Sequence, residues 1–283
     1  MPPEKNIGIF VNALAGKGNA VKILNNIVSF LKERRISHSV LINDWQSAYV
    51  DFTEAWIVGG DGTLNYFINH FPGIKIPLVL FKGGTGNDFA WKLYGDTSLK
   101  EQLEFVLKAA ARNVDAASCN DKIFINGVGI GFDGEVLESM NTIRLFAGHL
   151  GYLMIVIKKI FTFKEYLFSI KSDTFSGAGK YLLLMVSNSS RTGGGFHVSP
   201  LAKIDDSLLN LILCNRLSII KRLRYLPVIE KGKHLSLPFI KHFTGKSFVI
   251  DCEKELPAQL DGELIRAKRF EINILPDQFL FKY

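Results

Sequence analysis

A glycine-rich segment, Gly59-Gly60-Asp61-Gly62-Thr63, constrains the fold more than any other part of the sequence. It follows a short apolar run that predicts a buried strand, and it precedes an apolar stretch that predicts the start of a helix. Glycines at such a junction let the backbone approach a ligand closely, and the N–H groups there form a site for anions such as phosphate. Because a carboxylate repels phosphate, Asp61 indicates a hydroxyl, a metal ion or backbone N–H groups as its partner. A tight turn with Asp61 or Thr63 as N-cap is the alternative interpretation.

The first half of the chain alternates apolar strands with amphipathic helices. Two further glycine-rich segments, 12–18 and 83–88, each follow a predicted strand, as the first segment does. Continuously apolar strands predict a parallel sheet covered by helices on both faces, which is a three-layer α/β domain. Ligands of such sheets bind beyond the carboxyl ends of the strands, so three glycine-rich loops at one edge predict a nucleotide site. The predicted strands are residues 7–11, 39–42, 55–58 and 77–81.

Beyond about residue 115, predicted strands outnumber helices, and turns rich in glycine, asparagine and proline separate many of them. This pattern predicts an antiparallel sandwich or barrel. We therefore expect an α/β domain over residues 1–118 and an all-β sandwich domain over 119–283, with a last strand that can return to the first domain. The predicted strands are residues 123–128, 166–171, 181–187, 208–213, 247–251, 258–261 and 270–275. The predicted helices are residues 135–161, interrupted near Gly148, and residues 218–229.

Composition bounds the cellular setting. The formal net charge of +7 is compatible with an anionic substrate, nucleic acid or a membrane surface, and does not choose among them. The three isolated cysteines favour a reducing compartment over a disulfide framework. The N-terminal residues lack a signal-peptide pattern, and the most apolar stretch, 150–157, is too short to span a bilayer. We expect a cytoplasmic protein that can contact a membrane surface.

Several familiar site patterns are missing or incomplete. Residues 129–134 match G-x-G-x-x-G, but no acidic residue lies about 20 positions further on, so a structural turn is the better interpretation. The phosphate-loop pattern G-x-x-x-x-G-K-[ST] and the hydrolase pattern G-x-S-x-G do not occur. The six histidines form no metal-binding cluster in the sequence. Any nucleotide site therefore relies on the glycine-rich loops.

Two acidic pairs in the second half are candidates for chemistry. Asp205-Asp206 precedes a predicted strand, and paired carboxylates of this kind suit Mg²⁺, although a solvated turn is the alternative. Asp261-Gly262-Glu263 follows another strand, where a carboxylate can serve as general base toward a substrate hydroxyl. A hairpin turn is the alternative there.

A basic segment lies between these acidic pairs. Residues 216–246 hold eight lysines and arginines against one acid, Glu230, with apolar residues interleaved. A basic face beside an apolar one suits an anionic lipid surface. It also suits nucleic acid, and a helix with a solvated basic face is the third interpretation.

Taken together, the motifs resemble those of the diacylglycerol kinase catalytic-domain family. That family includes bacterial lipid kinases, eukaryotic diacylglycerol kinases, and sphingosine and ceramide kinases. The motifs occur in the family's order over nearly the whole chain, and the chain length is similar to that of the bacterial branch. The matching segments are 12–18, 59–65, 83–90, 126–134, 148–152, 193–196 with Pro200, Asp206 and 261–263.

The resemblance implies an ATP-dependent lipid kinase in which the first domain binds the nucleotide and the second supplies the lipid site. Asn12 and Thr85 would contact ATP. The central loop would do so through Gly59, Gly60, Asp61, Gly62, Thr63 and Asn65.

The resemblance also implies catalytic and metal-binding residues. Glu263 would be the general base on the lipid hydroxyl, and Asp61 would act on the nucleotide or on the geometry of phosphoryl transfer. Asp206, with the backbone carbonyls of Lys203 and Leu208, would bind a Mg²⁺ that the bacterial branch of the family uses structurally. The substrate would be presented at a membrane surface, with peripheral contact and no nucleic acid. An exposed sandwich edge would allow a homodimer.

Three positions depart from the family pattern, and two other functions stay open. Tyr66 stands where the family often has Glu, Ala13 where it has Pro, and Ser207 where it has Gly. Kinases of soluble substrates, such as NAD kinases and phosphofructokinases, share the Gly-Gly-Asp-Gly-Thr loop. The 83–90 loop and the Asp-Gly-Glu motif argue against them. A sensor that binds nucleotide or lipid without catalysis is the other alternative.

Overall fold

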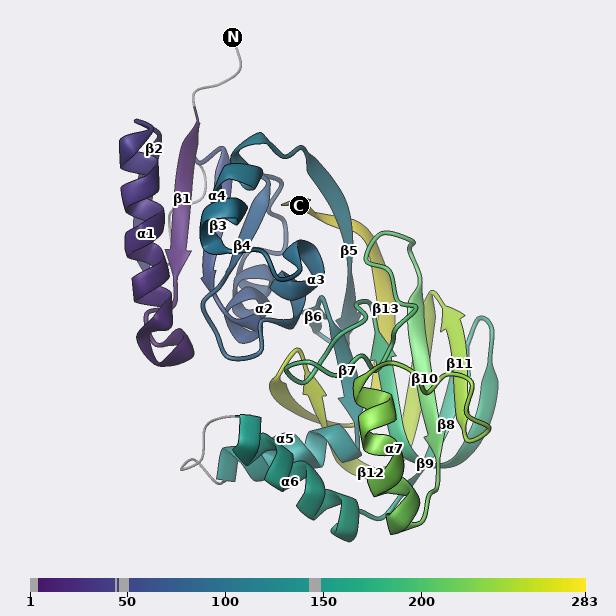
Figure 1. The fold of residues 1–283 in the computed structure, drawn as a ribbon. Coiled ribbons are helices and arrows are strands. Elements are labelled where there is room, and N and C mark those ends of the chain that lie inside the picture. Colours follow the sequence, from purple (N-terminus) through teal and green to yellow (C-terminus); the bar gives the residue numbers. More distant parts are fainter. Residues whose placement is uncertain (1–4, 44, 46–50, 143–148) are drawn as a thin grey trace. The chain divides into compact units, whose positions relative to one another are not determined.

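The computed structural model describes residues 5–43, 45, 51–142 and 149–283 (Figure 1). The chain divides into two compact units. Unit 1 contains Met1–Val114 and Asp277–Tyr283, and unit 2 contains Asp115–Pro276. Each unit is described by itself below. The predicted mixture of an α/β part with many further strands is confirmed.

Unit 1 is built on a parallel sheet in the order β2-β1-β3-β4. Every residue of β3 is buried, which explains why its sequence is continuously apolar. The end of β13 joins this sheet in parallel at β4, with Phe281 opposite Leu78. The four strands predicted from the sequence are confirmed within two residues at each end. They are β1 (Asn6–Val11), β2 (Ser37–Ile42), β3 (Glu54–Gly59) and β4 (Leu78–Lys82).

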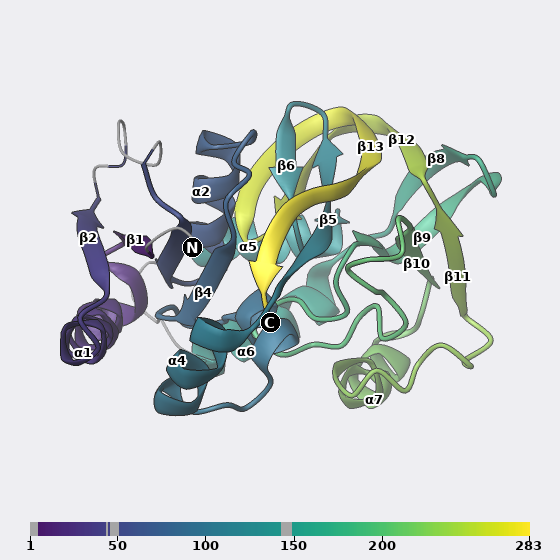
Figure 2. The same ribbon diagram turned by 90° about the horizontal axis from the view of Figure 1, so that it is seen from above.

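Amphipathic helices flank the strands of unit 1. The longest, α1, contacts β1, β2 and β3, and lies beside β1 and β2 in both views (Figures 1 and 2). Its buried residues Leu24, Ile27 and Leu31 recur every three or four positions, as one helix face requires. Coverage of both sheet faces, the three-layer arrangement, stays a prediction. The helices are α1 (Asn19–Glu33), α2 (Asp61–His70), α3 (Asp88–Tyr94) and α4 (Leu99–Lys108), with a short 3₁₀ turn at Ala15–Gly18.

Buried polar contacts hold the C-terminal segment in unit 1. The ammonium group of Lys282 lies 2.9 Å from a carboxylate oxygen of Glu54, and both side chains are buried. The hydroxyl of Tyr94 donates a hydrogen bond to the carbonyl oxygen of Lys282 at 2.9 Å. Residues 277–283 are therefore fixed to this unit by specific contacts as well as by strand pairing.

Unit 2 consists mainly of antiparallel strands around an apolar core. The predicted strand 123–128 is wrong in detail, because the chain bends at Ile125 and Asn126 and forms two strands there. The predicted strands 247–251 and 258–261 are one strand, β12, with a register shift between Asp251 and Leu256. The strands are β5 (Ala111–Cys119), β6 (Lys122–Phe124), β7 (Gly127–Ile130), β8 (Tyr166–Ser172), β9 (Ser176–Ser187), β10 (Leu209–Asn215), β11 (Ile240–Gly245), β12 (Ser247–Leu260) and β13 (Glu263–Lys282).

Among the described residues of unit 2, three helices occur, and they lie together in Figure 1. They are α5 (Phe132–Thr142), α6 (His149–Thr162) and α7 (Ile219–Glu230). The predicted interruption near Gly148 lies outside the described residues, and so does the first residue of the 148–152 motif. Among the described helices, none has the length and apolar character needed to cross a bilayer.

Candidate functional site

The three glycine-rich loops of unit 1 meet in direct backbone contact. Gly83 donates its N–H to the carbonyl oxygen of Gly59 at 2.9 Å, which joins the loops after β3 and β4. A Cβ atom on Gly84 would lie 2.4 Å from the Cα of Gly60, and one on Gly16 would lie 2.3 Å from the carbonyl oxygen of Gly83. Such distances exclude any side chain, so the glycines permit the loops to touch. The sequence-based expectation that these loops share one edge of the sheet is confirmed.

Asp61 has a structural role that accounts for a carboxylate in a candidate phosphate loop. Its two carboxylate oxygens accept hydrogen bonds from the backbone N–H groups of Asp88 and Phe89, each at 3.0 Å. These groups belong to the first turn of α3, where N–H groups have no partner within the helix. Asp61 therefore caps α3 from another helix, 27 positions earlier in the chain. Asp88, which was expected in a loop, begins a helix for this reason.

Side chains around the central loop order it further. The amide group of Asn12 donates to the hydroxyl of Thr63 at 3.2 Å, and its carbonyl oxygen accepts from the N–H of Leu14 at 3.1 Å. Asn65 is buried in α2 and accepts a hydrogen bond from Asn69, so its side chain supports the helix. Thr85 is exposed on the neighbouring loop. All the residues predicted to contact nucleotide thus lie in or beside the three loops, and their binding roles stay predictions.

The two carboxylates of the Asp-Gly-Glu motif in unit 2 have different surroundings: that of Asp261 is buried and that of Glu263 is exposed. Asp261 is only 4% exposed, and its oxygens accept the backbone N–H groups of Ile125, Asn126 and Gly127 at 2.7, 2.9 and 3.0 Å. Glu263 is exposed at the turn between β12 and β13. Asp261 therefore holds the bend between β6 and β7, which explains why 123–128 is not one strand. Glu263 remains available to a substrate.

The predicted metal ligands lie on a loop before β10. Asp206 accepts the backbone N–H of Leu208 at 3.2 Å, while Ser207 donates its N–H to Asp115 at 2.7 Å. Ser207 has φ +56°, the left-handed conformation that glycine adopts most easily, so serine takes the backbone geometry expected of the family's glycine. Partial burial raises the pKa of the Asp206 carboxyl, the bond from Leu208 opposes the shift, and Asp115 adds to it.

This donor set fits a hard cation. Mg²⁺ commonly takes one or two carboxylates, and fills its other positions with carbonyls and waters. Asp206 and the carbonyls of Lys203 and Leu208 provide such a set. No group of three or more acidic, histidine or cysteine side chains with metal-binding geometry occurs among the described residues. The magnesium site stays a prediction.

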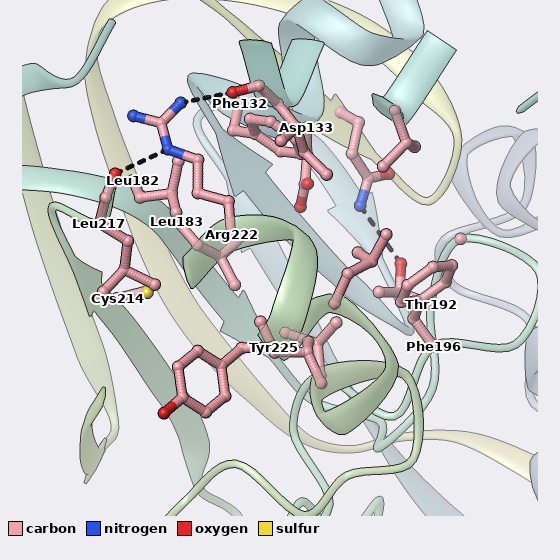
Figure 3. Close-up of a pocket in the computed structure, with 17 residues that line it drawn as sticks. Phe132, Asp133, Leu182, Leu183, Thr192, Phe196, Cys214, Leu217, Arg222 and Tyr225 are labelled. Atoms are coloured by element: carbon pink, nitrogen blue, oxygen red, sulfur yellow. Dashed lines mark hydrogen bonds between the residues drawn. The ribbon is translucent and has the colours of Figure 1, made fainter. Parts of the chain in front are cut away.

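An apolar cavity in unit 2 was not anticipated from the sequence (Figure 3). Its volume is about 100 Å³. Its walls come from α5, α6, α7, β9 and β10. Leu182 and Leu183 are adjacent in β9 and both buried, and this departure from alternation was the available signal of a second packed face. The lining residues are Phe132, Asp133, Val156, Ile160, Leu182, Leu183, Thr192, Gly193, Phe196, Val198, Cys214, Leu217, Arg222, Tyr225, Leu226, Ile229 and Gln259.

Comparison with protein families covers both halves of the chain. Residues 6–119 match the diacylglycerol kinase catalytic domain. Residues 126–280 match the YegS C-terminal NAD kinase beta sandwich-like domain. The second match is consistent with the sandwich predicted for the C-terminal half.

Comparison with individual proteins agrees with these matches. A protein of Shewanella frigidimarina named "Probable lipid kinase YegS-like" is 29% identical over 80% of this chain and 74% of its own length. A diacylglycerol kinase of Mycobacterium tuberculosis is 26% identical over 94% of this chain and 91% of its own. The solved structure of a candidate diacylglycerol kinase from Bacillus anthracis superposes with a TM-score of 0.82 at 26% identity, covering 99% of this chain and 95% of that one.

A more distant structure shares the fold alone. Yeast NADH kinase superposes with a TM-score of 0.54 at 13% identity, covering 97% of this chain and 79% of that one. The shared fold agrees with the Gly-Gly-Asp-Gly-Thr loop that the sequence has in common with NAD kinases.

Proposed function

The chain belongs to the diacylglycerol kinase family and is a lipid kinase, and from this premise we propose that it transfers the γ-phosphoryl group of ATP to the hydroxyl of diacylglycerol or a related lipid. The observation that carries the proposal is the backbone contact among the loops at Gly16, Gly59-Gly60 and Gly83-Gly84. Glycine loops beside the start of α2 offer N–H groups to phosphate oxygens without an intervening side chain.

The proposed division of labour follows from the chemistry of phosphoryl transfer. The protein has to position the phosphates, neutralise charge and orient the acceptor hydroxyl, while forming little covalent chemistry of its own. Asn12, the central loop and Thr85 would hold ATP, and Glu263 would accept the proton of the lipid hydroxyl. Mg²⁺ would neutralise charge on the phosphates, and Asp206 with neighbouring carbonyls would hold a structural Mg²⁺. Asp61 would act by fixing the loop that begins at Gly83.

The cavity of unit 2 favours a lipid over a soluble acceptor. Its lining is dominated by leucine, isoleucine, valine and phenylalanine, and a charged or polyhydroxyl substrate would leave polar groups unpaired there. The resemblance to NADH kinase is one of fold and does not favour a soluble acceptor. Tyr66, a departure that suggested a sensor, packs against Trp45 and stacks on His70, so it has a local structural role.

A labelling assay tests the proposed function. The purified full-length chain is incubated with ATP labelled on its γ-phosphate and with diacylglycerol, a wider lipid panel, NAD or fructose 6-phosphate. We expect label to enter the organic phase with diacylglycerol or another lipid, because the acceptor chain would occupy the apolar cavity. Label confined to NAD or fructose 6-phosphate would contradict the proposal, and ATP binding without transfer would favour the sensor.

We further propose that the lipid is taken from a membrane contacted by the outer surfaces of α6 and α7. Met154, Ile157 and Phe161 form one exposed stripe on α6, and α7, which packs beside α6, exposes Ile220 and its neighbours. We call this surface the α6–α7 face. Its exposed apolar residues are Met154, Ile157, Phe161, Ile219, Ile220 and Leu223, and its exposed basic residues are Lys158, Lys164, Arg216, Lys221 and Arg224.

Charge and position both favour an anionic bilayer at this face. Exposed apolar side chains beside basic ones match the acyl region and the headgroups of such a surface. The opposite sides of the same helices line the apolar cavity, through Val156 and Ile160 of α6 and Leu226 and Ile229 of α7. The helices α6 and α7 therefore contribute both to the α6–α7 face and to the wall of the cavity.

Replacing Ile220 by aspartate tests the membrane contact. Ile220 is 79% exposed, so the change should leave the fold intact. Binding to vesicles containing phosphatidylglycerol should fall by about tenfold or more, because burying an isoleucine is worth ~1.5–3 kcal/mol. Phe105→Asp, at an exposed phenylalanine of α4 in unit 1, is the matched control in co-sedimentation. Equal binding by both variants would place the membrane contact elsewhere.

A further inference from the structure

The cavity of unit 2 contains one carboxyl group, that of Asp133, in the first turn of α5 (Figure 3). The backbone around Asp133 is tightly fixed. A Cβ atom on Gly134 would lie 2.1 Å from the carbonyl oxygen of Pro257, so this turn is pressed against β12. A Cβ on Gly129 would lie 2.3 Å from a carboxylate oxygen of Asp133. Glycine at position 129 therefore makes the room in which the carboxyl group sits.

The other strongly polar groups lining the cavity are bonded within the chain. Arg222 donates to the carbonyl oxygens of Leu217 and Ile160 at 3.0 and 2.9 Å, and forms an ion pair with Glu165 at 2.6 Å. Gln259 donates to the hydroxyl of Thr192 at 3.3 Å and accepts the N–H of Gly262 at 2.9 Å. Figure 3 shows the bond from Arg222 to Leu217 and the bond that Thr192 accepts.

Asp133 differs from these groups. Within the part of the chain that the structure describes, its carboxyl group makes no hydrogen bond and no ion pair. It is half-buried, and its remaining accessible surface lines the apolar cavity. Burial raises the pKa of its carboxyl to about 7. A polar group without a partner in apolar surroundings costs stability, so its presence here is explained if a ligand supplies the partner.

Asp133 lies at the end of the cavity from which a series of contacts leads to Glu263. Its carboxyl lies against Gly129, and Gly129 is paired directly with Gln259 between β7 and β12. Gln259 in turn binds the N–H of Gly262, the residue before Glu263. A lipid with its hydrocarbon chain in the cavity and its polar end toward Gln259 would therefore place its functional groups near both carboxylic residues.

Resting on the proposed lipid kinase function, we propose that Asp133 is a specificity-determining residue whose protonated carboxyl donates a hydrogen bond to an ester carbonyl oxygen of the acyl lipid in the cavity. The substrate class is then an acylglycerol, which carries an ester a few atoms from its free hydroxyl. A plain long-chain alcohol offers no such acceptor. An ester oxygen accepts hydrogen bonds and cannot donate them, so it complements the neutral acid and not the carboxylate.

The groups around Asp133 leave it as the residue of this site that changes charge near neutral pH. Glu135 of α5 is paired with Lys159 of α6 at 2.8 Å and accepts a hydrogen bond from Tyr166. Arg222 of α7 is paired with Glu165. Burial raises the pKa of the Cys214 thiol of β10 to about 12, so it stays neutral. Tyr225 of α7 completes the titratable groups that line the cavity.

The test measures the KM of the full-length protein for two substrates in detergent micelles. One is a monoacylglycerol, and the other is a 1-alkanol of equal chain length. The hydrogen bond is present below the pKa and is lost as pH rises through 7. The KM for the monoacylglycerol should therefore rise ~3–10-fold between pH 6 and pH 8.5, the ratio expected for one hydrogen bond. The KM for the alkanol should stay flat. Asp133→Asn, which keeps a donor that does not titrate, should remove the pH dependence and keep the preference for the ester.

Asp133→Leu separates recognition from shape. It should raise the KM for the monoacylglycerol ~3–10-fold at pH 6 and leave that for the alkanol within about twofold. An equal rise for both lipids would overturn the proposal, because it would mean that the side chain only shapes the cavity. A preference for a long-chain amino alcohol that Asp133→Asn abolishes would also overturn it, since the carboxylate would then bind an ammonium group.

Binding of a fluorescent fatty-acyl ester with no free hydroxyl tests Asp133 independently of catalysis. If no lipid is phosphorylated but the probe binds more weakly at pH 8.5 in the wild type and not in Asp133→Asn, the proposed function fails and the role of Asp133 stands. If kinase activity is present but neither KM nor probe binding depends on Asp133, the role of Asp133 fails and the proposed function stands.

Discussion

Replacing Asp261 by alanine should lower the free energy of unfolding of unit 2 by about 3–5 kcal/mol. The carboxylate is almost fully buried and accepts three consecutive backbone N–H groups, those of Ile125, Asn126 and Gly127. Removing it leaves these three donors without partners in the interior, and each such loss costs ~1–3 kcal/mol before the structure relaxes. Asp261 also has φ +48°, a conformation that alanine adopts less readily than aspartate.

Urea unfolding followed by circular dichroism measures this change. All three tryptophans, Trp45, Trp56 and Trp91, lie in unit 1, so tryptophan fluorescence reports on that unit and circular dichroism on both. Hydrogen exchange of the amides at 125–127 gives a local reading, and their protection should fall most. Asp121→Ala, at an exposed aspartate of the same unit, is the control. If both variants unfold at the same urea concentration, Asp261 is not the residue that holds the bend.

Much of unit 1 could be predicted because the local sequence pattern of its strands and loops also determines which of them meet in the fold. The strands β1, β3 and β4 are almost fully buried, so their sequences are continuously apolar, and a glycine-rich loop follows each of them. The edge strand β2 is mostly exposed and has a mixed sequence. The loops have to meet because strands that run in parallel end at the same edge of a sheet. The contact between Gly60 and Gly84 is the physical reason for a pattern that is visible in the sequence.

The features that the sequence did not predict depend on contacts between residues that are far apart in the chain. Asp61 caps α3 from 27 positions away, so nothing in residues 83–90 alone shows that a helix begins at Asp88. Asp261 bends residues 125–127 from more than 130 positions away, which splits a stretch that is apolar enough for one strand. The cavity arises where α6 and α7 cross β9 and β10, and the order of residues does not specify that arrangement.

These long-range contacts also distinguish residues that hold a loop in place from residues that can meet a ligand. The sequence motifs alone did not distinguish these two roles. In both glycine motifs an aspartate stands beside residues expected to meet a ligand, and in both the structure gives that aspartate a set of backbone N–H groups to bind. Asp61 and Asp261 hold loops in place. The residue in the second motif that is free of such bonds in the described structure is Glu263, so the two functions of the Asp-Gly-Glu motif can be tested separately.

Replacing Glu263 by glutamine should reduce kcat for lipid phosphorylation by a factor of ~10²–10⁴, the usual contribution of a general base. Glutamine has nearly the same shape but cannot accept the hydroxyl proton. Glu263 is exposed at the turn between β12 and β13, so the free energy of unfolding should be unchanged, in contrast to Asp261→Ala. The affinity for ATP should also be unchanged, because the proposed nucleotide contacts are made by other residues.

Initial rates at saturating ATP and lipid measure this effect, and isothermal titration calorimetry measures ATP binding. Glu255→Gln is the matched control, since Glu255 is an exposed glutamate of β12 and its replacement makes the same change in net charge. If Glu263→Gln and Glu255→Gln both keep more than half of the wild-type kcat, proton acceptance by Glu263 is excluded. If kcat falls strongly for Glu263→Gln but not for Glu255→Gln, and the free energy of unfolding is unchanged, Glu263 is the general base. Asp261 then has a structural role, which is to hold the bend at residues 125–127.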